Sequence, residues 1–501
     1  MQLPWYLALL VPSYLTAQAG VAPDRAVQTI TPEDIGRRIS IVAHDSMLGR
    51  DNPSPGLELT ARYVASEFRR LGLRPAGENG SYEQRFQLSR WRVDTARSRI
   101  TLGGPGSRRL LKVGGEVRYV DGPIGPTPIT GSVVLMAGSL QPGTEVHDRI
   151  AMVLVDYSKP LPPSLGPQIY RLASSGVRAV LLLSNRDSAT FAERLRTGLE
   201  PRLARDAALD QDSIAPILEV HERTLGAFLR GLGINTGQLR RGPDSVRRAM
   251  PRFTVDIRLS RDVQSRADLP NVIGLLEGSD PVLRQEYVVY TAHIDHIGLA
   301  RSRPDSINNG ADDNASGVAG LLELAEAFSQ PGARPRRSLL FLAPSAEEPG
   351  LLGSAHFTDH PTVPLARVVA NINMDLIGRN WPDSVIAVGL EQSDLGTTLQ
   401  TVAGAHPELR MTPIADRWPE ERIFYRSDHY HFARKGVPIL FFTSGTHPDY
   451  HQPSDELARI NTEKESRLVR LLYYLGQAVA NRSDRPRWVA ESYRHIVERR
   501  Q

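Results

Sequence analysis

The 501-residue sequence has no cysteine and very little lysine. The absence of cysteine excludes disulfide bonds, thiolate metal ligands, iron–sulfur clusters, a cysteine nucleophile and a lipid-modified N-terminal cysteine. Any metal site in the chain must therefore be built from histidine, aspartate and glutamate. Lysine occurs only at Lys112, Lys159, Lys435 and Lys464, so arginine supplies nearly all of the positive charge.

A large net charge and long apolar runs are also missing. The 60 lysines and arginines nearly balance the 56 acidic residues, which leaves a formal net charge of +4. The arginines are scattered and mostly interleaved with acids, a pattern typical of solvated surface, and the sequence predicts no nucleic-acid partner. Beyond the N-terminal segment no run of about 20 apolar residues occurs, so no stable membrane span is expected.

The N-terminal residues predict export. Residues 3–17 are mostly apolar, and Ala17-Gln18-Ala19 has the small-x-small pattern of a signal-peptide cleavage site before Gly20. The alternative interpretation is a chain terminus that is only partly buried. We expect residues 1–19 to be a signal peptide and the mature chain to be secreted or periplasmic.

The length predicts two or three domains, at roughly 100–200 residues per domain. Apolar residues at helical spacing predict a helix over 57–71, and a proline-rich stretch at 123–128 introduces short β-rich runs that continue to residue 259. From Asn271 onward strands and helices alternate, which indicates an α/β fold with a mixed, mainly parallel sheet flanked by helices. We expect residues 20–122 to be the N-terminal part of the main domain, 123–260 a small β-rich insert, and 261–501 the main domain.

Five segments rich in acidic or histidine residues follow the predicted strands or begin the helix after one. They are residues 291–296 (TAHIDH), 309–317 (NGADDNASG), 345–350 (SAEEPG), 371–375 (NINMD) and 447–455 (HPDYHQPSD). Each alone has an ordinary explanation, such as a helix cap or a solvated turn. Ligands of such sheets bind at the carboxyl ends of the strands, so the conjunction predicts one shared site. Three carboxylates with two imidazoles suit a pair of Zn²⁺ ions.

These motifs resemble those of the family M28 zinc peptidases, which include bacterial and yeast aminopeptidases and glutamate carboxypeptidase II. The resemblance also covers the upstream Gly49-Arg50 loop with its helix and the segment 269–274 (LPNVIG). Residues 123–260 resemble a protease-associated (PA) domain. The resemblance implies a zinc-exopeptidase-like sandwich and an enzyme that hydrolyses peptides.

The resemblance also implies a ligand set for two Zn²⁺ ions. Asp313 would bridge both metals, because it precedes Ser316-Gly317 at the family's spacing. His293 and Asp375 would complete the ligands of one metal, and Glu348 and His451 would complete those of the other. His447 competes with His451 for the last position, but His451 carries the family's Tyr-His-x-x-x-Asp pattern.

Further roles follow from the same resemblance. Glu347 would be the general base, Asp295 would support His293, and Tyr450 would stabilise the oxyanion. We interpret His429 and His431, in the segment 427–432 (SDHYHF), as the wall or support of the pocket.

The favoured function is therefore an exported di-zinc aminopeptidase. In such an enzyme two metals lower the pKa of a water between them, and a carboxylate base takes its proton as the water attacks the scissile carbonyl. A carboxypeptidase or dipeptidase of the glutamate carboxypeptidase type is the main alternative, with Arg379, Arg422 and Arg426 as candidates for binding a terminal carboxylate. A glutaminyl cyclase and an inactive binding scaffold are further alternatives, but the presence of every ligand and of the base argues against both.

Overall fold

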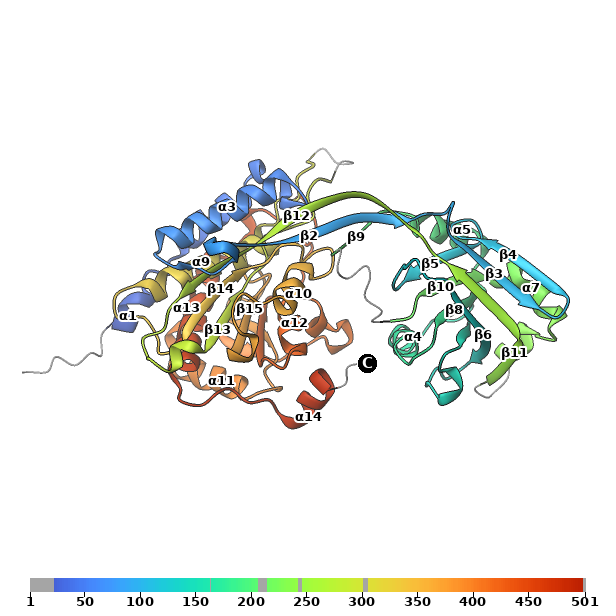
Figure 1. The fold of residues 1–501 in the computed structure, drawn as a ribbon. Coiled ribbons are helices and arrows are strands. Elements are labelled where there is room, and N and C mark those ends of the chain that lie inside the picture. The colour runs from blue at the N-terminus through green and yellow to red at the C-terminus, as the bar shows by residue number, and fades with distance from the viewer. Residues whose placement is uncertain (1–21, 163, 206–213, 242–245, 301–304, 499–501) are drawn as a thin grey trace, which may run out of the picture. The chain divides into compact units, whose positions relative to one another are not determined.

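The computed structural model describes residues 22–498, apart from residues 163, 206–213, 242–245 and 301–304 (Figure 1). The expected signal peptide therefore lies outside the described residues. The chain forms two compact units: the first comprises the residues up to Gln84 together with Pro270–Val497, and the second comprises Arg85–Leu269. None of the described helices is both long and apolar enough to cross a membrane.

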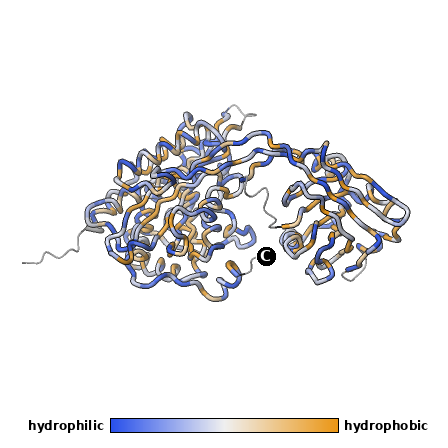
Figure 2. Tube along the Cα trace, viewed as in Figure 1, coloured by the Kyte–Doolittle hydropathy of each residue, from blue (hydrophilic) through white to orange (hydrophobic). Residues whose placement is uncertain are grey.

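The first unit is an α/β layer structure around four parallel central strands. These strands are β13 (Tyr287–Thr291), β14 (Ser338–Ala343), β15 (Val368–Met374) and β18 (Ile439–Thr443), in the spatial order β18-β15-β13-β14. They are almost continuously apolar and buried, as expected for strands covered on both faces. Figure 2 shows hydrophobic residues in the interior of this unit.

Antiparallel strands extend the sheet on both sides. β12 (Arg261–Leu276) pairs with β14, and β16 (Ser384–Val388) pairs with β18. Further outward β17 (Thr412–Ile414) lies beyond β16, and β1 (Arg74–Pro75) pairs with β12. Beyond β12 the strand order continues with β2 (Glu83–Val93) and β9 (Arg202–Arg205), whose paired residues belong to the second unit. The sheet is therefore mixed and mainly parallel at its centre, which confirms the predicted fold class.

Helices cover both faces of this sheet. On one face Tyr290 stacks on Phe341 and contacts Phe328, and the helices there are α2 (Pro32–Val42), α3 (Pro55–Arg70), α9 (Gly317–Ser329) and α13 (Thr462–Asn481). On the other face Phe357 and Phe432 pack into one apolar core with Val289, and they come from α10 (Leu352–Asp359) and α12 (His429–Arg434). Because successive strand residues point to opposite faces, each central strand contributes to both cores. The remaining helices of the unit are α1 (Ala22–Val27), α11 (Leu395–Ala405) and α14 (Ala490–Tyr493).

The predicted helix over 57–71 is confirmed as α3. The Ser54 hydroxyl accepts a hydrogen bond from the Leu57 amide at 3.1 Å, and Pro55 occupies the first helical turn, so the helix begins with a standard cap. Its apolar stripe is fully buried and ends at Phe68. Gly72 follows in the left-handed region (φ 73°), which ends the helix.

The second unit contains an eight-stranded sheet in the order β4-β3-β11-β6-β7-β8-β10-β5. The strands are β3 (Arg99–Gly104), β4 (Ser107–Lys112), β5 (Val117–Asp121), β6 (Ile129–Ala137), β7 (Ile150–Val155), β8 (Ala179–Ser184), β10 (Ile217–His221) and β11 (Val246–Arg258). β6, β7, β8 and β10 run parallel, and the helices among the described residues of this unit are α4 (Leu165–Ala173), α5 (Ser188–Thr197), α7 (Glu222–Gly231) and α8 (Thr236–Arg241).

This β-rich unit extends beyond residues 123–260. β3 pairs with β11 and β5 pairs with β10, so strands that precede the proline-rich stretch hydrogen-bond to strands that follow it. The chain passes between the two units through β2 and β12, which are neighbours in the first sheet. The local composition that marked the expected boundary carries no information about these long-range strand pairs.

Candidate metal centre

The five predicted segments lie at the carboxyl ends of the central strands. Residues 292–296 follow β13, residues 344–350 follow β14, Asp375 follows β15, and residues 444–455 come after β18. The fifth segment, Ala311–Ser316, forms a tight buried turn directly before α9. All these segments belong to the first unit, and four of them contribute residues to the lining of one pocket: Asp313, Glu347 and Glu348, Asp375, and Tyr450.

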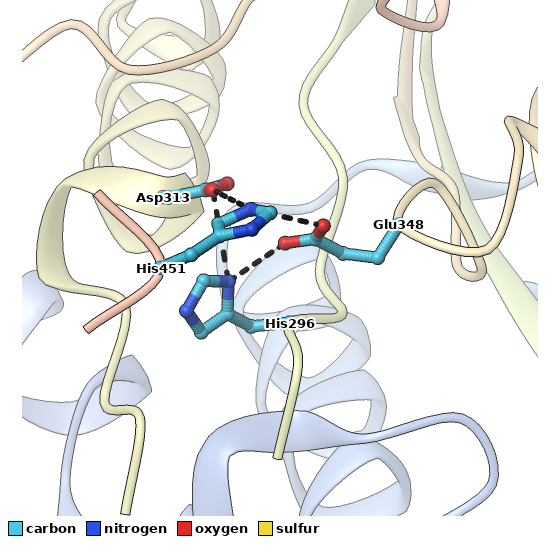
Figure 3. Close-up of side chains that lie close together, drawn as sticks. All are labelled: His296, Asp313, Glu348 and His451. Carbon is cyan, nitrogen blue, oxygen red and sulfur yellow. Dashed lines mark hydrogen bonds and ion pairs between the residues drawn. The ribbon is translucent and has the colours of Figure 1, made fainter. Parts of the chain in front are cut away.

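Four side chains form the first cluster: His296, Asp313, Glu348 and His451 (Figure 3). His451 Nε2 lies 3.1 Å from Asp313 Oδ2 and 3.2 Å from Glu348 Oε2. His296 Nδ1 lies 2.8 Å from Glu348 Oε1 but 3.8 Å from Asp313 Oδ2. Figure 3 shows the two imidazoles and the Glu348 carboxylate converging beside Asp313.

Three side chains form the second cluster: His293, Asp313 and Asp375. His293 Nε2 lies 3.3 Å from Asp375 Oδ1 and 3.5 Å from Asp313 Oδ1. Asp313 therefore presents one carboxylate oxygen to each cluster. All three side chains are at least nine-tenths buried.

The donor sets fit divalent cations such as zinc. Two ligands at about 2.0–2.1 Å from a tetrahedral metal lie about 3.3–3.4 Å apart, close to the 3.1–3.5 Å distances of His451 and His293 from their carboxylate partners. Imidazole nitrogen and carboxylate oxygen are both zinc ligands. Buried carboxylates this close repel one another unless a cation lies between them.

The electrostatics of the pocket reflect this crowding. Burial, reinforced by Glu348, raises the pKa of Asp313 to about 6. Burial alone would lower the pKa of His451, but hydrogen bonds to Asp313 and Glu348 raise it to about 10. Burial opposes ionisation of Glu348 as well, yet hydrogen bonds from His296 and His451 hold its pKa well below the ordinary value.

His296 was missing from the predicted ligand set. Its side chain is completely buried, and its Nδ1 contacts the Glu348 oxygen that does not face His451. The 2.8 Å separation is a hydrogen-bond distance and is short for two ligands of one metal. The geometry therefore fits an imidazole that orients Glu348, and the only sequence signal was its place in the His-x-Asp-His run 293–296.

Ser427 was also missing from the prediction, although it lies in the segment 427–432. Its hydroxyl donates to Asp375 Oδ2 at 2.8 Å and accepts from Asn373 Nδ2 at 2.8 Å. Asn373 Oδ1 in turn accepts from the Thr291 hydroxyl at 2.6 Å. This buried chain of hydrogen bonds fixes the Asp375 carboxylate, because both neighbours are themselves held.

Glu347 lines the cavity beside the second cluster, with its Oε2 4.0 Å from His293 Nε2. Burial, together with the neighbouring Asp375 and Glu348, raises its pKa well above the ordinary value, although the His293 charge opposes this shift. Asp295 supports the loop that carries Glu347, since its carboxylate accepts from the Glu347 and Glu348 amides at 3.0 and 3.2 Å. Its backbone oxygen, 3.2 Å from His293 Nδ1, lies closer to that ring than its carboxylate, at 3.6 Å.

Tyr450 lines the cavity and stacks on His451, with ring centroids 3.9 Å apart. Burial and the nearby Asp313 carboxylate raise the pKa of Tyr450, so its hydroxyl keeps its proton and can act as a donor.

The other histidines singled out from the sequence lie in neither cluster. His447 Nε2 is 3.2 Å from Asp312 Oδ2, behind the turn that carries Asp313. His429 Nε2 lies 2.9 Å from the Phe424 carbonyl oxygen, and the ring stacks on Phe441, which lines the cavity. His431 belongs to neither group of candidate ligands among the described residues.

The two clusters open into a cavity of about 190 Å³. Its wall away from the carboxylates contains Leu376, Trp418, Ile423 and Phe441. Trp418 stacks on Trp381 (ring centroids 5.9 Å apart) and lies against Gly445. A Cβ at Gly445 would be 2.9 Å from the indole, and the residue has a φ of 71°, so glycine allows this close approach.

Comparison with known proteins agrees with this geometry. Residues 271–475 match the family model described as peptidase family M28. The chain is 28% identical over 203 residues to aminopeptidase YwaD of Bacillus subtilis, covering 39% of this chain and 41% of that protein. It is 32% identical over 150 residues to leupeptin-inactivating enzyme 1 of Streptomyces exfoliatus, covering 29% and 32%. These matches span less than half the length of either relative.

The fold is also similar to that of a solved protein. An aminopeptidase from Aneurinibacillus sp. strain AM-1 aligns over 92% of this chain and 97% of its own, with a TM-score of 0.51 and 18% identity. At this identity the likeness concerns the fold alone.

Proposed function

We propose that this chain, whose residues 271–475 belong to peptidase family M28, is an exported aminopeptidase that uses two zinc ions. One observation carries the proposal. Asp313 presents its two carboxylate oxygens to two separate clusters, one buried and one partly buried, and both clusters contribute residues to the lining of the cavity that Glu347 also lines. The sequence relative named as an aminopeptidase in Bacillus subtilis supports the same activity.

The residues that would hold the ions divide between the clusters. His293 and Asp375 would bind one ion, Glu348 and His451 the other, and Asp313 would bridge them, with His296 orienting Glu348. When bound, such a pair of ions polarises a carbonyl oxygen and lowers the pKa of a water toward 7.

The protein's own groups would then move the protons. Glu347, as general base, accepts a proton from the attacking water and delivers it to the leaving amine. Burial raises its pKa above the ordinary value, which is the direction that makes a carboxylate a stronger base. Tyr450 lines the cavity and keeps its hydroxyl protonated, so it is a candidate donor to the developing oxyanion.

The cavity wall supports a preference for apolar N-terminal residues. Trp418, Ile423 and Phe441 present apolar surface next to the metal clusters. A substrate side chain that leaves water for this surface gains about 25 cal/mol per Å² of buried apolar area. We expect leucine or phenylalanine to be preferred to glycine or a charged residue.

The carboxypeptidase alternative depends on Arg426. Among the three arginines considered from sequence, Arg426 lines the cavity, whereas Arg379 pairs with Asp449 at 2.8 Å and Arg422 lies over the Tyr425 ring. Glu421 stands 3.9 Å from Arg426 and competes with a substrate carboxylate for it. This pairing is why we favour cleavage from the N-terminus.

The activity test compares the wild-type chain with Glu347→Gln on leucyl peptides with free and acetylated N-termini. We expect the wild type to cleave the free peptide only and to be inactivated by a chelator. Glu347→Gln should keep its zinc and lose about 10²–10⁴-fold in kcat, the usual contribution of a general base.

Two results would count against this assignment. A near-normal rate for Glu347→Gln would remove it as the base. Release of the C-terminal residue from acetylated peptides, abolished by Arg426→Ala, would favour the carboxypeptidase.

A further inference from the structure

The loop after β14 is held by side chains from other parts of the chain. Residues 345–348 carry the proposed base and one ligand, and all four of their backbone amides donate hydrogen bonds to side-chain oxygens. The acceptors are Asn271 Oδ1 (3.2 Å, residue 345), Asn52 Oδ1 (3.1 Å, residue 346), Asp295 Oδ1 (3.0 Å, residue 347) and Asp295 Oδ2 (3.2 Å, residue 348). Nothing within the loop itself satisfies these amides.

This external support is needed because the loop is strained. Ala346 has a φ of 54°, in the left-handed region that non-glycine residues rarely adopt. Such a conformation persists only when surrounding groups determine it. The amide of Ala346 is the one that Asn52 binds.

Asn52 uses both ends of its side-chain amide. Its oxygen accepts from Ala346, and its Nδ2 donates to Asp295 Oδ2 at 2.6 Å. Asn52 therefore binds the loop directly, and it also binds the Asp295 carboxylate, which accepts hydrogen bonds from the Glu347 and Glu348 amides. The side chain is 5% exposed, so water does not replace these contacts.

The segment that carries Asn52 is itself fixed against the metal centre. The buried Arg50 guanidinium donates to the carbonyl oxygens of Ile294, Asn309 and Gly310 at 2.7–3.1 Å. The Arg50 carbonyl accepts from the His296 amide at 3.2 Å. A residue about 240 positions before the first ligand is thus placed rigidly beside the loop of Glu347 and Glu348.

We propose that Asn52 is a positioning residue of the hydrolytic site, which holds residues 346–348 so that the Glu347 and Glu348 carboxylates face the clusters. For Glu347 this inference rests on the proposed function, and for Glu348 it rests on metal binding alone. Asparagine is required because one donor and one acceptor must be supplied at the same place. Alanine supplies neither, and aspartate keeps the acceptor but sets a second carboxylate against Asp295.

The test uses the full chain with Asn52→Ala and Asn52→Asp, and Asn481→Ala as the matched control. Asn481 Oδ1 accepts from the Arg336 amide at 2.9 Å, two residues before β14 begins, so the control removes the same kind of hydrogen bond beside the other end of that strand. Three quantities are measured for each variant. Zinc affinity is determined by chelator competition, and kcat and KM are determined on a leucyl peptide. Tm is determined in the absence of metal.

We expect both Asn52 variants to bind one of the two zinc ions about 10–100-fold more weakly and, when zinc-saturated, to lose about 10–100-fold in kcat with KM changed less than about threefold. Asn481→Ala should lower Tm without changing zinc affinity or kcat. Aspartate fills the same volume as asparagine, so Asn52→Asp gives the measurement if the alanine variant does not fold.

Wild-type zinc affinity and kcat in both Asn52 variants would overturn the inference. The inference would also be overturned if Asn481→Ala lost as much zinc affinity and kcat as the Asn52 variants at an equal fall in Tm. If the wild type binds zinc but cleaves no peptide, the proposed function fails, while the zinc affinities of the Asn52 variants still decide the positioning role.

Discussion

At the scale of single residues, the metal centre depends on side chains that bind the candidate ligands. His296 contacts Glu348, Ser427 contacts Asp375, and Asn52 contacts Asp295. None of the three was assigned a role from the sequence. A residue that hydrogen-bonds to a candidate ligand can come from any sequence position that the fold places beside that ligand. The candidate ligands, in contrast, could be named from the sequence, because its motifs resemble those of the M28 peptidases.

His296 provides the residue-scale prediction. His296→Ala should weaken zinc binding about 10–100-fold, because Glu348 loses a 2.8 Å hydrogen bond. His296→Asn should recover part of this loss, since the asparagine amide nitrogen falls near the place of Nδ1. The measurement is zinc affinity by chelator competition, with the exposed His147→Ala of the second unit as control. Equal losses in the alanine and asparagine variants would indicate that His296 is itself a ligand.

At the scale of elements, the alternation of strands and helices after Asn271 predicted the α/β sheet, and helical spacing predicted α3. Such elements can be predicted from the local sequence. A strand buried on both faces is apolar throughout, and a helix buried on one face has apolar residues at helical spacing. The order of the strands and the pairing of β5 with β10 were not predictable, since neither leaves a local signal. The extent of the second unit follows from those pairings.

The turn before β13 provides a prediction at this scale. Asp280 accepts from the Val282 and Leu283 amides, both at 2.9 Å, and from Arg336 at 2.8 Å. These hydrogen bonds, the Leu283 amide first, lower the pKa of Asp280 to about 2. A carboxyl with a lowered folded-state pKa stabilises the protein above its unfolded-state pKa, and this stabilisation is lost as the pH falls toward the folded-state value.

Asp280→Asn should therefore lower Tm at pH 7, and the difference from wild type should shrink between about pH 4 and pH 2. Thermal unfolding across this range is the measurement. A Tm difference that stays constant or grows with acidification would show that ionisation of Asp280 does not stabilise the turn.

At the scale of the whole molecule, the candidate site lies entirely within the first unit. The sequence predicted this location, because the five segments rich in acidic or histidine residues all follow residue 270. The second unit supplies neither candidate cluster among the described residues, and its resemblance to a PA domain remains a prediction. Export also remains a prediction, since it depends on residues outside those described.

The central claim is that two zinc ions share Asp313. Anomalous diffraction at the zinc edge from crystals of the zinc-loaded chain tests it most directly. The account predicts two peaks about 3.5–4 Å apart on either side of Asp313, one beside His293 and Asp375 and the other beside Glu348 and His451. A single peak, or peaks away from Asp313, would contradict it.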